Sequence, residues 1–201
     1  MHEYTTKELP KLKIIYWLTI ISIVISPVVS SYFEIILTRI PFLKNLSELA
    51  FYSISGFCVF SILWAIINIW LWKIIPFFNV PNLSGSWTII GESIDYRDIT
   101  PKPFKWEGNL IIKQTLSKIS IVLKTKTSQS SSFNAILEQY NKKEGVLTYT
   151  YKNDNLDNNP KWMSHEGMCR IYFDLRTKTA KATYCNNKDR PTYGTMNITK
   201  D

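Results

Sequence analysis

The sequence predicts a membrane-anchored all-β protein: two N-terminal transmembrane helices followed by an eight-stranded antiparallel up-and-down β-barrel. Two observations predict this fold class. Hydrophobic residues gather in two long runs within about the first 75 residues. Beyond these runs, polar and apolar residues alternate in short segments separated by polar turns, as strands with one buried face require. The chain therefore divides into a transmembrane region, residues 1–78, and a β-barrel domain, residues 79–201.

The two apolar runs, residues 14–33 and 49–72, contain no charged side chain. Each is long enough to cross about 30 Å of hydrocarbon as a helix that rises ~1.5 Å per residue. A helix is expected because lipid offers the backbone no hydrogen-bond partners. Small residues in the second run, Ser53, Ser55 and Gly56, are candidates for a helix contact face.

A cleaved secretory signal is the alternative for the first run, because lysines precede it and Val28-Val29-Ser30 resembles a cleavage site. The second run, which follows closely, favours two membrane spans. Lysines and arginines before the first span and after the second predict that both termini are cytoplasmic. Such a reducing compartment suits Cys58, Cys169 and Cys185 as free thiols.

Eight candidate strands follow the connector around Pro76 and Pro81. They cover residues 84–92, 105–114, 118–127, 131–140, 145–153, 165–175, 179–186 and 193–199. Even spacing and short sequential connections favour a closed barrel, with a β-sandwich as the alternative. Gly85-Ser86-Trp87 resembles the Gly-x-Trp that opens lipocalin-type barrels, in which the Trp plugs one end.

Alternation along the third, fifth, sixth and seventh strands predicts an interior that is apolar at one end and polar at the other. Antiparallel order brings the polar ends to one rim. The side chains expected in this cup are Thr125, Thr127, Ser132, Tyr149, Tyr151, Asn153, His165, Tyr184 and Arg190. Taken singly, each has a simpler interpretation as a turn serine, a core tyrosine or a structural histidine. Their convergence predicts a ligand-binding site.

Charge and motifs restrict the function. Residues 79–201 hold 18 Lys and Arg against 12 Asp and Glu, an excess of six positive charges, which favours anionic ligands or anionic lipid heads. The sequence contains no basic helix and no zinc module, so nothing in it suggests binding of duplex nucleic acid. Two histidines, His2 and His165, predict no metal site, and catalytic motifs such as Gly-x-Ser-x-Gly are absent from the sequence. The domain is predicted to bind a ligand without a cofactor and without catalysis.

Several motifs occur in order along the chain after the paired spans: Ser84-Gly85-Ser86-Trp87, residues 108–114, residues 123–128 followed by Ser130 to Ser132 and Ala135, residues 147–153, His165-Glu166-Gly167, and residues 184–194. This order resembles the two-transmembrane, β-strand-rich effectors associated with bacterial cyclic-oligonucleotide-based anti-phage signalling systems. One departure is Ala182, where a Gly is expected before the Tyr of the seventh strand; it narrows the interior slightly.

The resemblance implies a cell-death effector of the bacterial inner membrane. Its barrel would bind a cyclic dinucleotide made by a partner nucleotidyltransferase, form a homo-oligomer on activation, and disrupt the membrane through its contacts with lipids. In that role Arg190 would pair with a phosphate, the three tyrosines would stack on bases, and Thr125, Thr127, Ser132, Asn153 and His165 would bond to sugar or base edges. The alternatives are a membrane-tethered carrier of a fatty acid or similar lipid, and a small lipid-acting enzyme with His165 as base.

Overall fold

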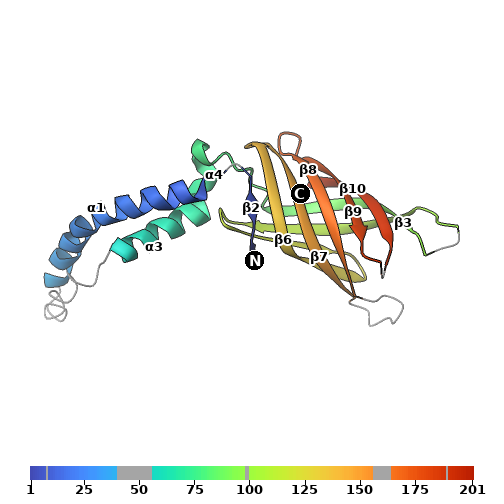
Figure 1. Ribbon diagram of the computed structural model, residues 1–201, viewed down its shortest axis with the longest axis horizontal. Helices are drawn as coiled ribbons and strands as arrows, with labels where there is room; N and C mark the ends of the chain where they lie inside the picture. Colours follow the sequence, from blue (N-terminus) through green and yellow to red (C-terminus); the bar gives the residue numbers. More distant parts are fainter. Residues whose placement is uncertain (8, 40–55, 98–99, 156–163, 189) are drawn as a thin grey trace. The chain divides into compact units, whose positions relative to one another are not determined.

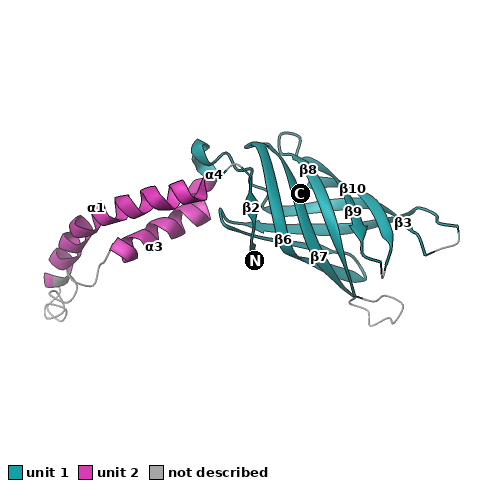
Figure 2. Cartoon of the chain, in the orientation of Figure 1, with its two compact units in different colours: residues 1–9, 73–201 teal, residues 10–72 magenta. Residues whose placement is uncertain are grey.

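A computed structural model of the protein describes residues 1–7, 9–39, 56–97, 100–155, 164–188 and 190–201. It contains two compact units (Figure 2): residues 10–72 form one, and residues 1–9 together with 73–201 form the other. The sequence predicts a division after residue 78. In the structure the first nine residues and the connector belong to the barrel unit.

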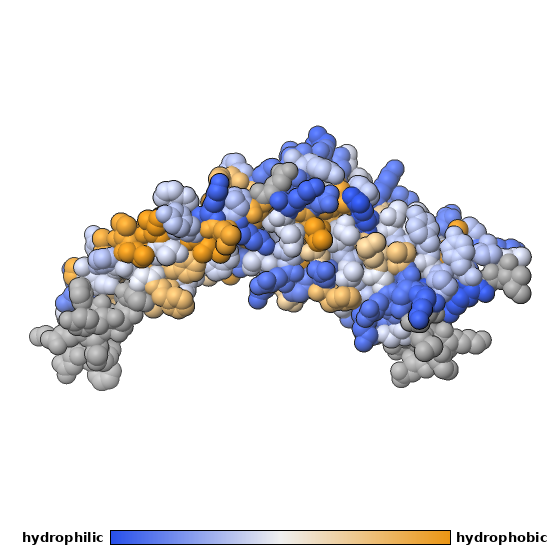
Figure 3. Space-filling view, in the orientation of Figure 1, coloured by the Kyte–Doolittle hydropathy of each residue, from blue (hydrophilic) through white to orange (hydrophobic). Residues whose placement is uncertain are grey.

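The first unit consists of apolar helices, and apolar side chains gather over it in Figure 3. Helix α1 spans Lys11–Thr38, and α3, Gly56–Ile66, continues through a π-helical turn, η2 (Ile67–Leu71), into α4 (Trp72–Ile74). Two stretches are long and apolar enough to cross a membrane, Lys11–Ile36 and Gly56–Ile74. They support the predicted membrane association.

Helices α1 and α3 approach closely at Gly56. A Cβ atom placed on this glycine would lie 3.5 Å from Ile23 Cγ1 and 3.6 Å from Ile23 Cα. The missing side chain therefore lets the two helices come together, as small residues do in membrane helix pairs. The other predicted contact residues, Ser53 and Ser55, lie outside the described residues.

The second unit is a closed antiparallel barrel of eight long strands (Figure 1). These are β3 (Gly85–Asp95), β4 (Phe104–Gln114), β5 (Lys118–Lys124), β6 (Ser128–Asn141), β7 (Glu144–Asn155), β8 (His165–Asp174), β9 (Thr179–Asn186) and β10 (Thr192–Lys200). Each strand pairs with the next, and β10 pairs with β3 from Thr192 opposite Asp95 to Lys200 opposite Trp87. This closing ladder confirms the predicted barrel and excludes the sandwich. A short 3₁₀ turn, η3 (Pro76–Phe78), precedes it.

The third strand ends earlier than its sequence pattern predicts. The hydroxyl of Thr125 accepts hydrogen bonds from the backbone N–H groups of Thr127 and Ser128, at 3.3 and 3.0 Å. This side-chain turn ends β5 at Lys124, and β6 begins at Ser128 instead of residue 131. A bulge between Ser132 and Asn134 then shifts the β6–β7 register, as bulges do next to binding sites.

Two short strands at the N-terminus complete the wall. Strands β5 and β6 pair directly over three residues each, from Val122 opposite Ser131 to Lys124 opposite Gln129. Beyond that point β1 (His2–Glu3) pairs with β5, and β2 (Thr5–Thr6) pairs in parallel with β6. The sequence does not predict these strands, because two residues are too few to show a period.

One end of the barrel is filled by apolar side chains. Trp87 is fully buried there; its indole N–H donates to the carbonyl oxygen of Leu83 at 3.1 Å, and its ring packs edge-on against Phe173, 5.0 Å between centroids. Other fully buried side chains of this core are Ile89, Leu110, Ile119, Ile121, Leu137, Leu147 and Ile171. Each contributes roughly 1.5–3 kcal/mol by leaving water. A solid base of this kind leaves the opposite end free for a cavity.

Candidate ligand-binding site

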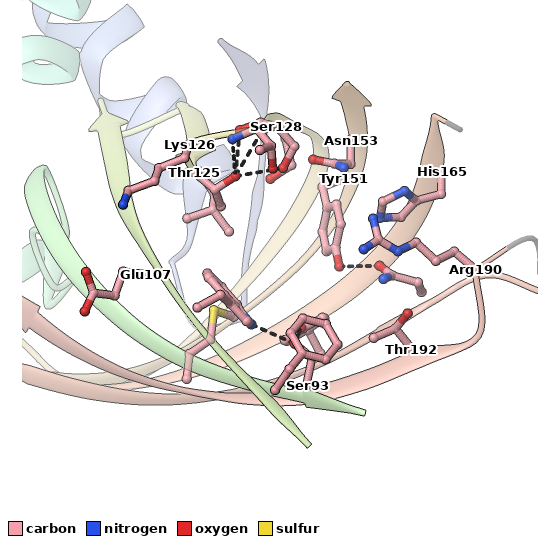
Figure 4. A pocket seen from close by; sticks show the side chains of 18 of the residues that line it. Ser93, Glu107, Thr125, Lys126, Ser128, Tyr151, Asn153, His165, Arg190 and Thr192 are labelled. Carbon is pink, nitrogen blue, oxygen red and sulfur yellow. Dashed lines mark hydrogen bonds between the residues drawn. The ribbon is translucent and has the colours of Figure 1, made fainter. Parts of the chain in front are cut away.

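A cavity of about 620 Å³ occupies the polar end of the barrel. Eight of the nine side chains predicted from the sequence line it: Thr125, Thr127, Tyr149, Tyr151, Asn153, His165, Tyr184 and Arg190. Figure 4 shows Tyr151, His165 and Arg190 pointing toward one part of this cup, with Thr125 and Ser128 across from them. The volume falls within the range of small-molecule sites.

Ser132 is the predicted residue that does not line the cup. Its hydroxyl accepts the backbone N–H of Ile121 at 3.0 Å and bonds to the Nε2 atom of His2 at 2.7 Å. Ser132 therefore closes the junction between β5, β6 and the N-terminus. Ser130, two residues earlier on the same face of β6, lines the cup in its place and is buried.

The cup also contains side chains from β3, β4 and β10, which the sequence argument left out. Among these residues are Ser93, Trp106, Glu107 and Thr192. The signal for two of them is present in the sequence. Trp87 and Ile89 are buried in alternation on β3, as Leu110 and Ile112 are on β4, so extending the two patterns directs Ser93 and Trp106 inward.

Three aromatic side chains of the cup lie against glycines directly opposite on neighbouring strands. Trp106 pairs with Gly91, Tyr151 with Gly167, and Tyr184 with Gly194. A Cβ atom on these glycines would lie 2.3 Å from Trp106 Cε2, 2.6 Å from Tyr151 Cζ and 2.4 Å from Tyr184 Cε1. Each glycine thus supplies the space in which one ring lies against the wall.

Hydrogen bonds hold these rings in place. The buried hydroxyl of Ser93 accepts the indole N–H of Trp106 at 2.7 Å and bonds to the hydroxyl of Tyr184. The two rings meet edge to face, 6.1 Å between centroids. On the other side of the cup, the hydroxyl of Tyr151 donates to the side-chain oxygen of Asn186 at 2.7 Å. The aromatic lining is therefore ordered before any ligand arrives.

Three cations, Lys105, Lys126 and Arg190, and one acid, Glu107, line the cup, so its net charge is positive. Its tyrosines are neutral. Burial raises the pKa of Tyr149, Tyr151 and Tyr184 above the usual value, so their hydroxyls keep their protons. Burial, and then the neighbouring Arg97, lower the pKa of Arg190, but a guanidinium remains charged at any physiological pH. The hydroxyl of Thr192 is buried and has no hydrogen-bond partner among the described residues.

A closed barrel with an apolar base and a cup of ordered rings, hydroxyls and one half-buried guanidinium defines a small-ligand receptor carried by two apolar helices. Comparison with known proteins gives the same class. Residues 78–200 match the family model "Cap15, cyclic dinucleotide receptor domain". The chain is also 35% identical over 174 residues to the CD-NTase-associated protein 15 of Yersinia aleksiciae, covering 82% of this chain and 81% of the relative. The chain belongs to the Cap15 family.

Proposed function

We propose that this protein is a membrane effector of a bacterial anti-phage signalling system and that its cup binds a cyclic dinucleotide. The observation that carries the proposal is the set of three aromatic rings laid against glycines around a cavity of about 620 Å³. Flat rings with one face toward the cavity suit stacking on bases, worth roughly 1–3 kcal/mol per base. Family membership supports the same ligand class.

Polar groups around the rings would hold the rest of the ligand. Arg190 projects into the cup beside His165 and Tyr151 (Figure 4), where a guanidinium can bond a phosphate with two parallel N–H groups. Thr127, Ser130, Asn153 and Thr192 supply hydroxyls and an amide for sugar and base edges. Thr125 lines the cup, but its hydroxyl already bonds within the turn that ends β5. Ser132 is left out of this set because its hydroxyl is used in the wall.

The proposal extends to the membrane. Residues 10–72 would cross the inner membrane twice, with both termini in the cytoplasm, and the barrel, from about residue 79 onward, would face the cytoplasm where the nucleotide is made. A nucleotidyltransferase partner would make the ligand, binding would drive self-association of the chain, and the gathered helices would disrupt the bilayer. No enzymatic step is part of this mechanism.

Binding to the full-length protein in detergent tests the proposal. Calorimetry with cyclic di-AMP, cyclic di-GMP and cyclic GMP-AMP should find at least one ligand at micromolar affinity. Arg190→Ala should weaken it about 10- to 150-fold, as loss of a charge-assisted hydrogen bond of ~1.5–3 kcal/mol requires. Tyr151→Ala should weaken it similarly through loss of stacking.

Lys113→Ala is the matched control, because it removes a positive charge from an exposed position on β4 outside the cup. It should leave the affinity unchanged. Retained affinity in the Arg190 and Tyr151 variants would remove the roles given to these side chains. If a fatty acid bound and none of the nucleotides did, the protein would instead be a membrane-tethered lipid carrier.

A further inference from the structure

The N-terminal strap, residues 2–7, is built into the barrel wall immediately before the first apolar helix. Its two short strands bridge β5 and β6, and the N–H of Lys7 donates to the carbonyl oxygen of Leu137 at 3.2 Å. Tyr4 within it is 3% exposed. The strap is thus held along its length by the wall, and the chain passes from it into α1.

The strap also touches the wall of the cup. His2 bonds to the hydroxyl of Ser132 at 2.7 Å, and that hydroxyl accepts the N–H of Ile121. Ser130, two residues away on β6, lines the cavity. The thin β5–β6 junction is therefore shared by the cup at one end and by the strap at the other.

Gln114 on β4 joins the strap to the segment that follows the helices. The side chain is 5% exposed. Its Oε1 atom accepts the N–H of Leu83 at 2.8 Å, while its Nε2 atom donates to the Tyr4 hydroxyl at 3.1 Å and to the Pro81 carbonyl oxygen at 3.3 Å. The Tyr4 hydroxyl in turn donates to the carbonyl oxygen of Thr115 at 3.2 Å.

One amide is thereby bonded to both connections of the helical unit. Tyr4 precedes α1, and Pro81 and Leu83 follow α4. Each bond alone contributes about 0.5–1.5 kcal/mol, but a buried group left without its partner costs roughly 1–3 kcal/mol. Removing the Gln114 amide would leave the N–H of Leu83, a fully buried residue, without its hydrogen-bond acceptor.

We propose that Gln114 is a positioning residue that fixes both connections to one point of the barrel, so that a ligand-driven change in the barrel reaches both apolar helices together. The inference rests on the proposed function for the nature of the signal. Unanchored connections would behave as flexible chains, which let the barrel and the helices reorient independently. Connections fixed to one strand transmit displacement, because neither can move without the other.

The test compares the full-length protein with Gln114→Leu. Gln139→Leu is the matched control, since Gln139 is also a buried glutamine, 4% exposed, on β6 and makes no side-chain hydrogen bond to the strap or to residues 81–83. Tyr4→Phe is a milder second variant that removes a single hydroxyl. Each protein is measured for cyclic dinucleotide affinity, for dye release from vesicles after nucleotide addition, and for amide hydrogen exchange at residues 4–6 and 81–83.

Gln114→Leu should keep its nucleotide affinity within about twofold and lose at least tenfold in nucleotide-triggered dye release, with faster exchange in both segments. Tyr4→Phe should show the same changes to a smaller degree, and Gln139→Leu should behave as the parent. Dye release equal to that of the parent, with equal affinity, would overturn the role of Gln114.

The exchange measurement separates this inference from the function on which it rests. If the parent binds no nucleotide, the proposed function fails, but hydrogen exchange still tests whether Gln114 fixes both connections to the barrel. Unchanged exchange at residues 4–6 and 81–83 in both Gln114→Leu and Tyr4→Phe would then overturn the role of Gln114 in fixing these segments. Exchange that rises in the two segments together would support it.

Discussion

Replacing Gly91 by Ala tests whether the glycines make room for the rings that bind the ligand. The added Cβ would lie 2.3 Å from Trp106 Cε2 and 2.4 Å from Cζ2. The indole must retreat by about 1.2 Å to reach an ordinary carbon–carbon contact of ~3.5 Å. The other near atom at this glycine also belongs to Trp106, so the ring, and not the backbone, has to move. The retreat also stretches its 2.7 Å bond to Ser93.

The expected cost to the fold is small and the cost to binding is large. Overpacking typically destabilises by about 1–3 kcal/mol, and the open cup beside Trp106 places this substitution at the lower end. Loss of one stacking surface costs roughly 1–3 kcal/mol of binding, about 5- to 150-fold in affinity. Calorimetry of the full-length protein with the cyclic dinucleotide that binds the parent measures it, and thermal unfolding measures the fold.

Gly145→Ala is the control for Gly91→Ala. Its Cβ would lie 3.2 Å from Glu138 O and from Pro81 Cγ, so it adds the same methyl group with milder crowding, at a position outside the cup. This variant should bind like the parent. The reasoning would be refuted if Gly91→Ala bound the nucleotide within twofold of the parent, or if both variants lost affinity equally.

Two further predictions concern alkaline pH and the helix pair. Burial raises the pKa of the Cys169 thiol from 9.0 to about 12. Because the thiol of the unfolded chain therefore ionises first, barrel stability should fall between pH 9 and 12, by up to ~1.4 kcal/mol per pH unit. The unfolding midpoint of Cys169→Ala should fall less than that of the parent over this range, and equal falls would contradict the assignment. Gly56→Leu places a large side chain where a Cβ already meets Ile23 at 3.5 Å; it should reduce nucleotide-triggered dye release from vesicles with nucleotide affinity unchanged, and undiminished release would show that this helix contact is dispensable.

Much of the fold and most of the cup follow from the sequence, because alternation has physical causes. A strand with one face in the core must alternate, so Leu147, Tyr149 and Tyr151 reveal an inward face. The same alternation, continued past the apolar residues, places Asn153 in the cup. Hydrophobic runs likewise identify both apolar helices.

The remaining features depend on interactions that a periodic pattern does not contain. Hydrogen bonds to Ile121 and His2 take the hydroxyl of Ser132 out of the cup, and the turn closed by Thr125 shortens β5. Each strand of the strap has only two residues, and the strap is held by the side-chain amide of Gln114, which is distant in the sequence. Gly91 and Trp106 are 15 positions apart in the sequence, and their pairing depends on the register between β3 and β4.

The strap has a practical consequence for the barrel when it is prepared alone. Cutting the chain near residue 79 removes β1 and β2 and exposes the backbone edges of β5 near Ile119 and of β6 near Leu137, which the strap covers. Open strand edges recruit strands from other molecules. A truncated barrel would therefore assemble by strand exchange through this gap, and its aggregates would imitate signalling oligomers without any nucleotide. Supplying residues 1–9 as a separate peptide should suppress them.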